Sequence, residues 1–493
     1  MQWNTLKALL MFGLAAFLAI CCGISVAVGE YRLMFLAMGV CLFIAMVVFP
    51  GYPALLAFAI FCPFAPPLPF IWQFPFVALV LGVCMMKFFV ERAISSTVLR
   101  SVNTLSFSFA LFFGWVALRW CMKPALPNVA GWGQNVTGFR AYLGYGIAFG
   151  LVFLLGRFVP TRDDLSKLFR WMTIGALVFM WILIPLIFAK TTFAIALNYL
   201  GVFVAYFDNG MLRLVNLPFF GVVAISTSML PLLFPTTKRR RVFLFLVGWA
   251  AVVLGGTRSG LLMALAVFFA ILFLKKQWLR FSLFFGIIAM SGLGIYYAGD
   301  EFNKLTNVGF LRPLSVISEP LAHNSDAEAS WEWRKIRWDR AIEQIRLHPL
   351  IGESYGGMEN AWIWGEEAGE IQEEQLEMTM ATGGVHNGFL DCALALGIPA
   401  ALLMIYILAS RIFISAHRAF ALKNSDPFMS QANCFLSANL VALVVSISIG
   451  SDVNDKQLWF YLGLTVLAGH LSIKPTRASN PMTSRREEQL VAV

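Results

Sequence analysis

Charged residues are scarce in this chain of 493 residues, and their scarcity excludes an ordinary soluble protein. Only 13% of the residues are Asp, Glu, Lys or Arg, while 59% are hydrophobic and the mean hydropathy is +0.75. A soluble chain carries about 25% charged residues. The apolar runs are long enough for a bilayer core, which needs about 20 residues per helix. Because lipid leaves no backbone group unpaired, and because the strand alternation of a barrel is absent, these runs are predicted to be helices.

The chain also lacks the patterns of a disulfide framework, a metal site or a nucleic-acid surface. Almost all of its eight cysteines lie in apolar runs, and no Cys-x-x-Cys spacing occurs. The net charge of +10 is not accompanied by a basic patch interleaved with exposed aromatics, so nucleic acid is not an expected partner. No cofactor is expected.

The apolar runs predict an all-α, polytopic membrane helix bundle of about 12–14 transmembrane helices. Fourteen candidate spans lie near 8–28, 32–49, 52–68, 71–90, 104–120, 142–158, 170–189, 216–235, 242–257, 259–275, 281–298, 387–409, 432–450 and 457–473. The third and fourth are interrupted by prolines, and a single re-entrant hairpin is the alternative there.

Clusters of Lys and Arg give the orientation. They lie at 87–100, 157–170, 238–241, 275–280, 411–423 and 474–486. All of them fall on one side when the spans are counted alternately, and the positive-inside rule assigns that side to the cytoplasm. The other face of the membrane protein is therefore expected outside the cytoplasm.

One long polar segment interrupts the apolar runs. Sixteen of the 27 acidic residues lie between Asp300 and Glu377. The expected organisation is an N-terminal bundle of about 11 spans (1–298), a large loop outside the cytoplasm with short helices (299–386), about three C-terminal spans (387–473) and a cytoplasmic tail (474–493). Within the loop, residues from Trp331 to Leu347 have helical spacing, and His348-Pro349 ends the helix.

Arg258 is the first candidate functional residue. It lies in Gly-Gly-Thr-Arg-Ser-Gly between two apolar runs, where an isolated charge costs about 2.5–3.5 kcal/mol. The start of the following helix favours anions. The alternative is an Arg that reaches the headgroups.

Further basic residues lie on the same predicted side. Arg213 precedes a span, and Arg334, Arg337 and Arg340 repeat every three residues along the loop helix. A guanidinium can bind phosphate oxygens in a bidentate fashion. The structural alternative for Arg213 is a membrane anchor. For the other three arginines it is ion pairing along the helix.

His386 is the candidate base. It stands where the loop meets the next span, before Asn387 and Gly388, and Asp391 follows little more than one helical turn later and could orient it. Neutral imidazole is a suitable general base for a sugar hydroxyl.

These residues resemble a known family. The segment Trp338-Asp-Arg-Ala-Ile-Glu-Gln-Ile-Arg-Leu-His-Pro-Leu-Ile-Gly352, followed by His386-Asn-Gly-Phe-Leu390 and Ala395-Leu-Gly397, resembles the signature of the O-antigen ligase and O-antigen polymerase superfamily. Arg334 four residues before the Trp, the Thr257-Arg258 turn and Arg213 also match. One departure is Gly352-Glu-Ser where the family usually has Gly-x-Gly.

The resemblance implies an inverting, metal-independent glycosyltransferase in a bacterial inner membrane. Its active site and the large loop (299–386) would then be on the periplasmic face. The donor would be a glycan on undecaprenyl pyrophosphate, and the acceptor would be another glycan or lipid A–core. Arg258, Arg213, Arg334 and Arg337 would bind the pyrophosphate, and Arg258 would also be catalytic by stabilising the negative charge that grows on the leaving group. His386 would activate the acceptor hydroxyl, with Asn387, Asp391 and Trp338 in support. Polymerase and ligase both remain open, and a transporter or flippase for lipid-linked glycans is the alternative from another class.

Overall fold

The computed structural model describes residues 56–57, 59–62, 76–94, 107–124, 137–157, 161–184, 204–206, 212–214, 216–306, 325–355, 385–450, 453 and 455–473. The predicted spans near 8–28 and 32–49, most of the span near 52–68, the loop residues 356–384 and the predicted tail lie outside these residues. The division into four segments therefore stays a prediction.

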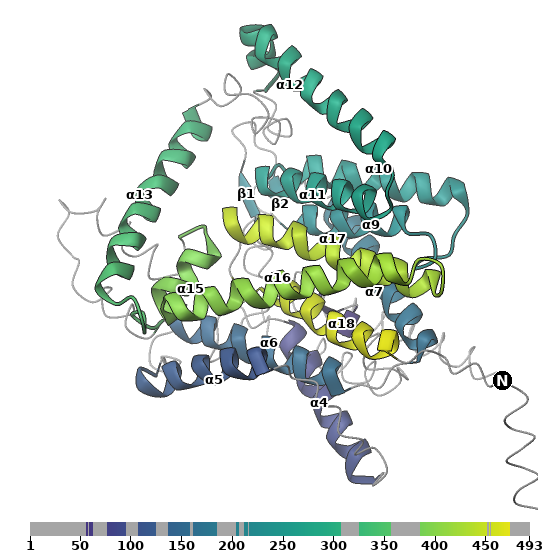
Figure 1. Ribbon diagram of the computed structural model, residues 1–493. Coiled ribbons are helices and arrows are strands. Elements are labelled where there is room, and N and C mark those ends of the chain that lie inside the picture. The colour runs from purple at the N-terminus through teal and green to yellow at the C-terminus, as the bar shows by residue number, and fades with distance from the viewer. Residues whose placement is uncertain are drawn as a thin grey trace, which may run out of the picture.

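The regular elements among the described residues are helices, apart from one short pair of strands (Figure 1). The helices are α4 (Phe76–Ile94), α5 (Phe107–Met122), α6 (Thr137–Arg157), α7 (Arg162–Leu183), α9 (Leu217–Met229), α10 (Lys238–Leu254), α11 (Arg258–Leu274), α12 (Trp278–Thr306), α13 (Ser325–Leu347), α15 (Gly388–Leu396), α16 (Ile398–Ala421), α17 (Pro427–Ile449) and α18 (Lys456–Ile473). Strands β1 (Val204–Tyr206) and β2 (Leu212–Leu214) are antiparallel. The all-α membrane class predicted from the sequence is confirmed.

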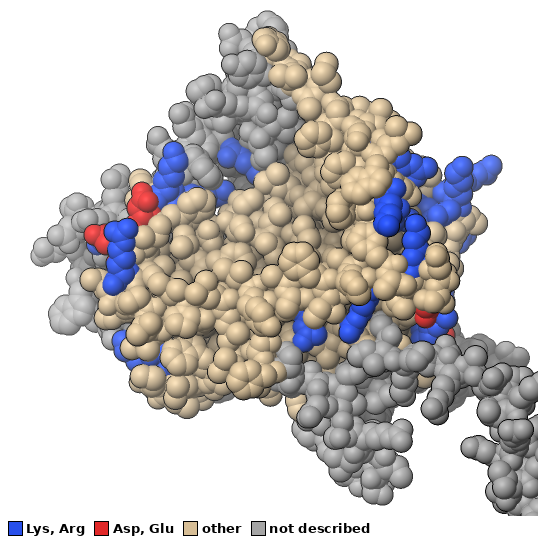
Figure 2. Space-filling model, viewed as in Figure 1, with Lys and Arg blue, Asp and Glu red and all other residues tan. Residues whose placement is uncertain are grey.

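Three of the described helices, α7, α16 and α17, are long and apolar enough to cross a bilayer by length and composition. Shorter apolar helices, among them α5, α9 and α11, pack with them. Many large apolar side chains face outward, for example Trp181 on α7, Leu246 on α10 and Phe413 on α16. Figure 2 shows most charged side chains toward the two ends of the helices, with a broad uncharged band between them, as a protein in a bilayer requires.

The helix directions define two ends of the bundle. Arg162 at the start of α7 pairs with Asp426 before α17 at 2.9 Å, and Lys275 after α11 donates to the carbonyl of Met229 at the end of α9 at 2.8 Å. We call the end that contains these contacts the basic end. The opposite end, which we call the loop end, contains the start of α11, the end of α17 and the start of α16.

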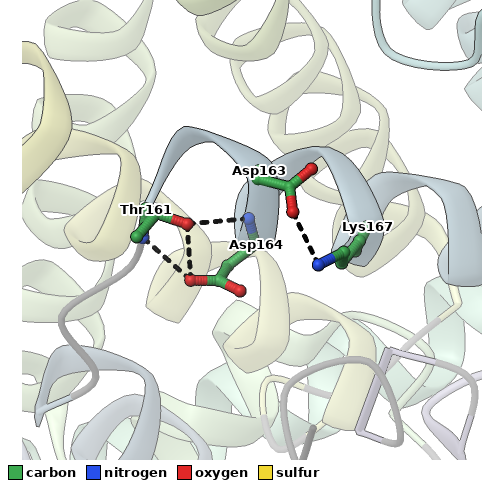
Figure 3. A network of polar contacts seen from close by, with 4 residues as sticks. All are labelled: Thr161, Asp163, Asp164 and Lys167. Atoms are coloured by element: carbon green, nitrogen blue, oxygen red, sulfur yellow. Dashed lines mark hydrogen bonds and ion pairs between the residues drawn. The ribbon is translucent and has the colours of Figure 1, made fainter.

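Helix α7 begins about two turns earlier than the predicted span near 170–189. Thr161 accepts a hydrogen bond from the backbone N–H of Asp164 at 3.2 Å, and the Asp164 carboxylate accepts from the N–H of Thr161 at 3.0 Å (Figure 3). Asp163 and Lys167 pair one turn further on, at 2.6 Å. This capping box starts the helix in the polar segment before the apolar run, where hydropathy gives no signal.

The predicted span near 387–409 is wrong as a single helix. Gly397 adopts φ 90° and separates α15, which has 9 residues, from α16, which extends to Ala421. Pro399 follows within the first turn of α16. Apolar composition continues across the break, so composition alone does not reveal it.

Two glycines bring α9 and α10 together. A Cβ built on Gly221 would lie 2.5 Å from the carbonyl oxygen of Gly248, and one built on Gly248 would lie 2.8 Å from that of Gly221. Small residues at such crossings let backbones approach closely in membranes.

We expect Gly221→Ala to destabilise the bundle by about 1–3 kcal/mol, because the added methyl group would force the two backbones apart. Gly286→Ala in α12 is the matched control, since no atom lies within 4 Å of the place its methyl group would take. Thermal unfolding in detergent, followed by size-exclusion chromatography, would measure both. Equal midpoints for the two variants would contradict the close crossing.

Candidate active site

Helix α13 of the predicted large loop is docked against α15. The indole N–H of Trp338 donates to the carbonyl of Val385 at 3.0 Å, and Ala341 and Ile345 are buried. The structure confirms the helix predicted from Trp331 to Leu347, although it begins at Ser325. Trp338 thus ties α13 to the residue immediately before His386.

His386 has an unusual backbone conformation. Its φ is 54°, in the left-handed region, which costs a non-glycine residue about 1–2 kcal/mol. Its side chain is exposed. Asn387 then caps α15, because its side-chain oxygen accepts from the N–H groups of Phe389 at 3.1 Å and Leu390 at 3.2 Å. Asn387 therefore shapes the turn that presents His386.

The surroundings of His386 favour the neutral imidazole. Loss of water around the ring lowers its pKa, and the positive charges of Arg334 and Arg337 lower it further, to about 4. The residue as a whole is exposed, while neighbouring protein atoms displace water from around its ring. Near pH 7 the ring nitrogen is therefore available to accept a proton.

Three of the arginines of α13, namely Arg334, Arg337 and Arg340, differ in their surroundings. Arg340 pairs with Glu343 at 3.2 Å, as the structural alternative predicts. Arg334 and Arg337 are half-buried, and their charges act on His386. These three arginines are evenly spaced, three residues apart, so their spacing in the sequence could not show which of them would lie near His386.

Arg258 is the first residue of α11, at the loop end of the bundle. Thr257 caps the helix by accepting from the N–H of Gly260 at 3.1 Å, and Gly256 has φ 63°. A Cβ on Gly260 would lie 2.5 Å from Cβ of Pro218, so the turn is packed tightly against the start of α9. The tight turn predicted at 256–260 is present.

Arg213 lies in β2, opposite Ala205 of β1, five residues before Pro218. Its backbone therefore approaches the same helix start that supports the Arg258 turn. The Arg213 side chain lies outside the described part of the chain.

The structure corrects the role expected for Asp391. Its carboxylate accepts a hydrogen bond from the Tyr355 hydroxyl at 2.9 Å, and no hydrogen bond joins it to His386 among the described residues. Asp391 is 3% exposed and points toward the loop segment that follows α13. Its position one turn after Asn387 was predicted from the sequence, but its partner was not.

Sequence reasoning missed four polar residues in and around the segment that contacts Asp391: Arg119, Tyr142, Ser354 and Tyr355. Arg119 is 1% exposed and donates to the carbonyl of Gly352 at 2.9 Å. The Tyr142 hydroxyl and Ser354 lie 2.7 Å apart. A charge inside an apolar run, the argument applied to Arg258, would have identified Arg119. No sequence signal identified the tyrosines.

The fold and the site define a helical membrane protein in which two arginines, Arg334 and Arg337, act on a neutral histidine at one end of the bundle. Residues 243–405 match the family model for O-antigen ligase, which confirms the resemblance to the O-antigen ligase and polymerase superfamily. The matched segment includes Arg258, α13 and His386. A search of curated proteins finds no match. The family supports a membrane enzyme of glycan transfer that uses a lipid-linked glycan and an acceptor.

We expect the His386 ring to titrate near pH 4, far below an unperturbed imidazole at about 6.5. NMR of histidine-labelled protein would follow the signal that His386→Gln removes. Replacing Arg334 and Arg337 together with Gln removes two positive charges that oppose the imidazolium, so the midpoint should rise. The rise should stop short of 6.5 because the loss of water, which is the larger cause, remains. Arg346→Gln, at an exposed position on α13, is the control. A wild-type midpoint near 6.5 would contradict the described surroundings.

Proposed function

We propose that this protein is a glycosyltransferase that moves a glycan from undecaprenyl pyrophosphate to a hydroxyl group of an acceptor. The observation that carries the proposal is the neutral His386 beside the charges of Arg334 and Arg337. A base and an anion-binding pair are what such a transfer needs at neighbouring positions. The family match for residues 243–405 supports the class of reaction.

In the proposed reaction the acceptor oxygen attacks the anomeric carbon of the donor sugar, and the bond from that carbon to the diphosphate oxygen breaks. The diphosphate leaves with the electron pair, and the proton of the acceptor passes to His386. Attack opposite the leaving group inverts the anomeric centre. Arginines stabilise the negative charge that grows on the diphosphate. We assign this role to Arg258, Arg334 and Arg337, with Arg213 in support, and the proposed step uses no metal ion.

Two of these arginines, Arg334 and Arg337, would also regulate the base. In the free protein their charges help to hold the pKa of His386 at about 4, which leaves the ring neutral but weakly basic. A bound diphosphate offsets those charges, so the pKa of His386 rises toward neutrality. A general base is most effective when its pKa lies near the working pH. The base would therefore strengthen when the donor is in place.

The orientation of the site is part of the proposal. The basic end contains Arg162, Lys238–Arg241, Lys275 and Lys423, and the positive-inside rule assigns such an end to the cytoplasm. The loop end, with Arg258 and His386, would then face the periplasm at the lipid boundary. A donor anchored in the membrane by its undecaprenyl chain would present its pyrophosphate at that level.

The deciding experiment incubates purified protein in EDTA with a lipid-pyrophosphate oligosaccharide, with and without lipid A–core. Lengthened lipid-linked chains would identify a polymerase. Label moved to lipid A–core would identify a ligase. Neither product, together with movement of the labelled lipid across vesicles, would overturn the proposal in favour of a flippase.

Arg258→Ala should lower transfer at least about 100-fold, the loss typical of removing one donor to a developing oxyanion. Arg258→Lys should recover only part of the rate, because an ammonium lacks the bidentate fork. Arg280→Ala is the control, since this exposed arginine lies at the basic end. Transfer at the wild-type rate by a folded Arg258→Ala protein would remove the pyrophosphate role.

His386→Ala should lower the turnover number far more than it weakens donor binding. Turnover would be measured with saturating donor, and binding with a fluorescent donor analogue. Equal losses in both quantities would indicate a structural histidine.

A further inference from the structure

The segment from His348 to Tyr355 fills the helix break at Gly397. The N–H groups of Glu353 and Ser354 donate to the carbonyls of Leu394 at 2.8 Å and Ala395 at 2.9 Å. The N–H of Ile398 donates to the carbonyl of Pro349 at 2.8 Å. The helix break frees these carbonyls from helical partners, and the segment satisfies them.

The fit requires glycine on both sides. Gly352 has φ 65°, and a Cβ there would lie 2.6 Å from the N atom of Gly397. A Cβ on Gly397 would overlap the carbonyl oxygen of Leu350. The two backbones therefore touch directly, and neither can shift without breaking the hydrogen bonds of the other.

Side chains from α5 and α6 cover the segment from the opposite side. Arg119 of α5 donates to the Gly352 carbonyl at 2.9 Å. Tyr142 of α6 bonds with Ser354 at 2.7 Å. Ser354 has φ 70°, so a hydrogen-bonded serine occupies a conformation that usually calls for glycine.

Tyr355 is the last residue of the segment and is buried. It is 3% exposed, and the ring of Tyr142 meets it edge-on at 5.4 Å between centroids. Its hydroxyl donates to Oδ2 of Asp391 at 2.9 Å, while Oδ1 of Asp391 is buried and has no hydrogen-bond partner among the described residues. Burial and the Asp391 charge raise the pKa of Tyr355 well above its ordinary value, so the hydroxyl keeps its proton and stays a donor.

The hydrogen bond between Tyr355 and Asp391 is connected to His386 through one turn of α15. The N–H of Asp391 donates to the carbonyl of Asn387 at 2.9 Å, and Asn387 is the cap that follows His386. On its other side, His386 follows Val385, which Trp338 of α13 holds. The segment from His348 to Tyr355 continues α13, so both attachments join the helix that carries Arg334 and Arg337 to the helix start that carries His386.

We propose that Tyr355 and Asp391 are positioning residues that hold the start of α15, and with it His386, at the distance from Arg334 and Arg337 that the transfer reaction needs. A buried carboxylate with an unsatisfied oxygen is destabilising in itself. The hydrogen bond that the Asp391 carboxylate accepts from Tyr355 gives a reason for a carboxylate at this buried position. The activity readout of this inference rests on the proposed function, and the spectroscopic readout does not.

The test compares two Tyr→Phe variants of the same segment in the full-length protein. Tyr355→Phe removes only the hydroxyl that reaches Asp391, and Tyr142→Phe removes only the hydroxyl that reaches Ser354. We expect Tyr355→Phe to lower the turnover number about 10-fold with little change in KM for the lipid-pyrophosphate donor, and Tyr142→Phe to change it less than twofold. Asp391→Ala should resemble Tyr355→Phe. Asp391→Asn should restore most of the rate, because its amide oxygen can accept the same hydrogen bond.

The titration of His386 provides a readout that does not depend on turnover. In Tyr355→Phe the ring should move away from the enclosing protein atoms and from Arg334 and Arg337, so its NMR midpoint should rise above about 4. In Tyr142→Phe and Asp391→Asn the midpoint should stay at the wild-type value. Equal losses of turnover in both Tyr→Phe variants, or an unchanged midpoint in Tyr355→Phe, would overturn the inference. An inactive wild-type protein in which the midpoint still shifts as expected would overturn the proposed function and leave the positioning role intact.

Discussion

The helix break at Gly397 is the constraint on which the loop end of the bundle depends. A continuous helix through residues 388–421 would satisfy its own carbonyls and would leave no edge for the loop to join. With Gly397 at φ 90°, the carbonyls of Leu394 and Ala395 accept instead from Glu353 and Ser354, and the carbonyl of Leu396 accepts from the indole of Trp115 at 2.7 Å. Unpaired backbone groups are costly near lipid. The break therefore leaves backbone carbonyls that need hydrogen-bond donors, and the segment after α13 supplies donors to two of them. A polar loop is in this way built into a membrane bundle.

Much of this arrangement could be predicted from the sequence, because it follows from composition and from local turn chemistry. The low charge content predicted a membrane helix bundle, and the Gly-Gly-Thr-Arg-Ser-Gly motif predicted the tight turn at Arg258. The helical spacing before His348-Pro349 predicted α13 to its last residue. The alternating basic clusters placed Arg258 and His386 at one end, and the helix directions in the structure agree. These features depend on residues close together in the chain, where a pattern has a direct physical meaning.

The rest depends on contacts between distant residues, which no local pattern records. Arg119 and Gly352 are 233 positions apart, and Tyr142 and Ser354 are 212 positions apart. The Gly352-Glu-Ser sequence looked like a departure from the usual Gly-x-Gly. In the structure Ser354 does take a backbone conformation suited to glycine, and its hydroxyl compensates by bonding with Tyr142. Asp391 was predicted to face His386 because the two are near in sequence. It faces Tyr355 because α15 turns its carboxylate into the buried side of the break.

The arginines show why residue type alone cannot assign a role. Arg119, Arg162 and Arg340 each satisfy an identified group of the protein: a loop carbonyl, the Asp426 carboxylate and the Glu343 carboxylate. These contacts stabilise the fold. Arg334 and Arg337 differ in what their charges do, because they lower the pKa of the one histidine that stands at the junction of loop and bundle. Two positive charges beside a neutral base make its protonation less favourable. An anion bound next to the two arginines would offset this electrostatic effect. This electrostatic effect on His386 is the reason for assigning Arg334 and Arg337 to the anionic donor in the proposed reaction.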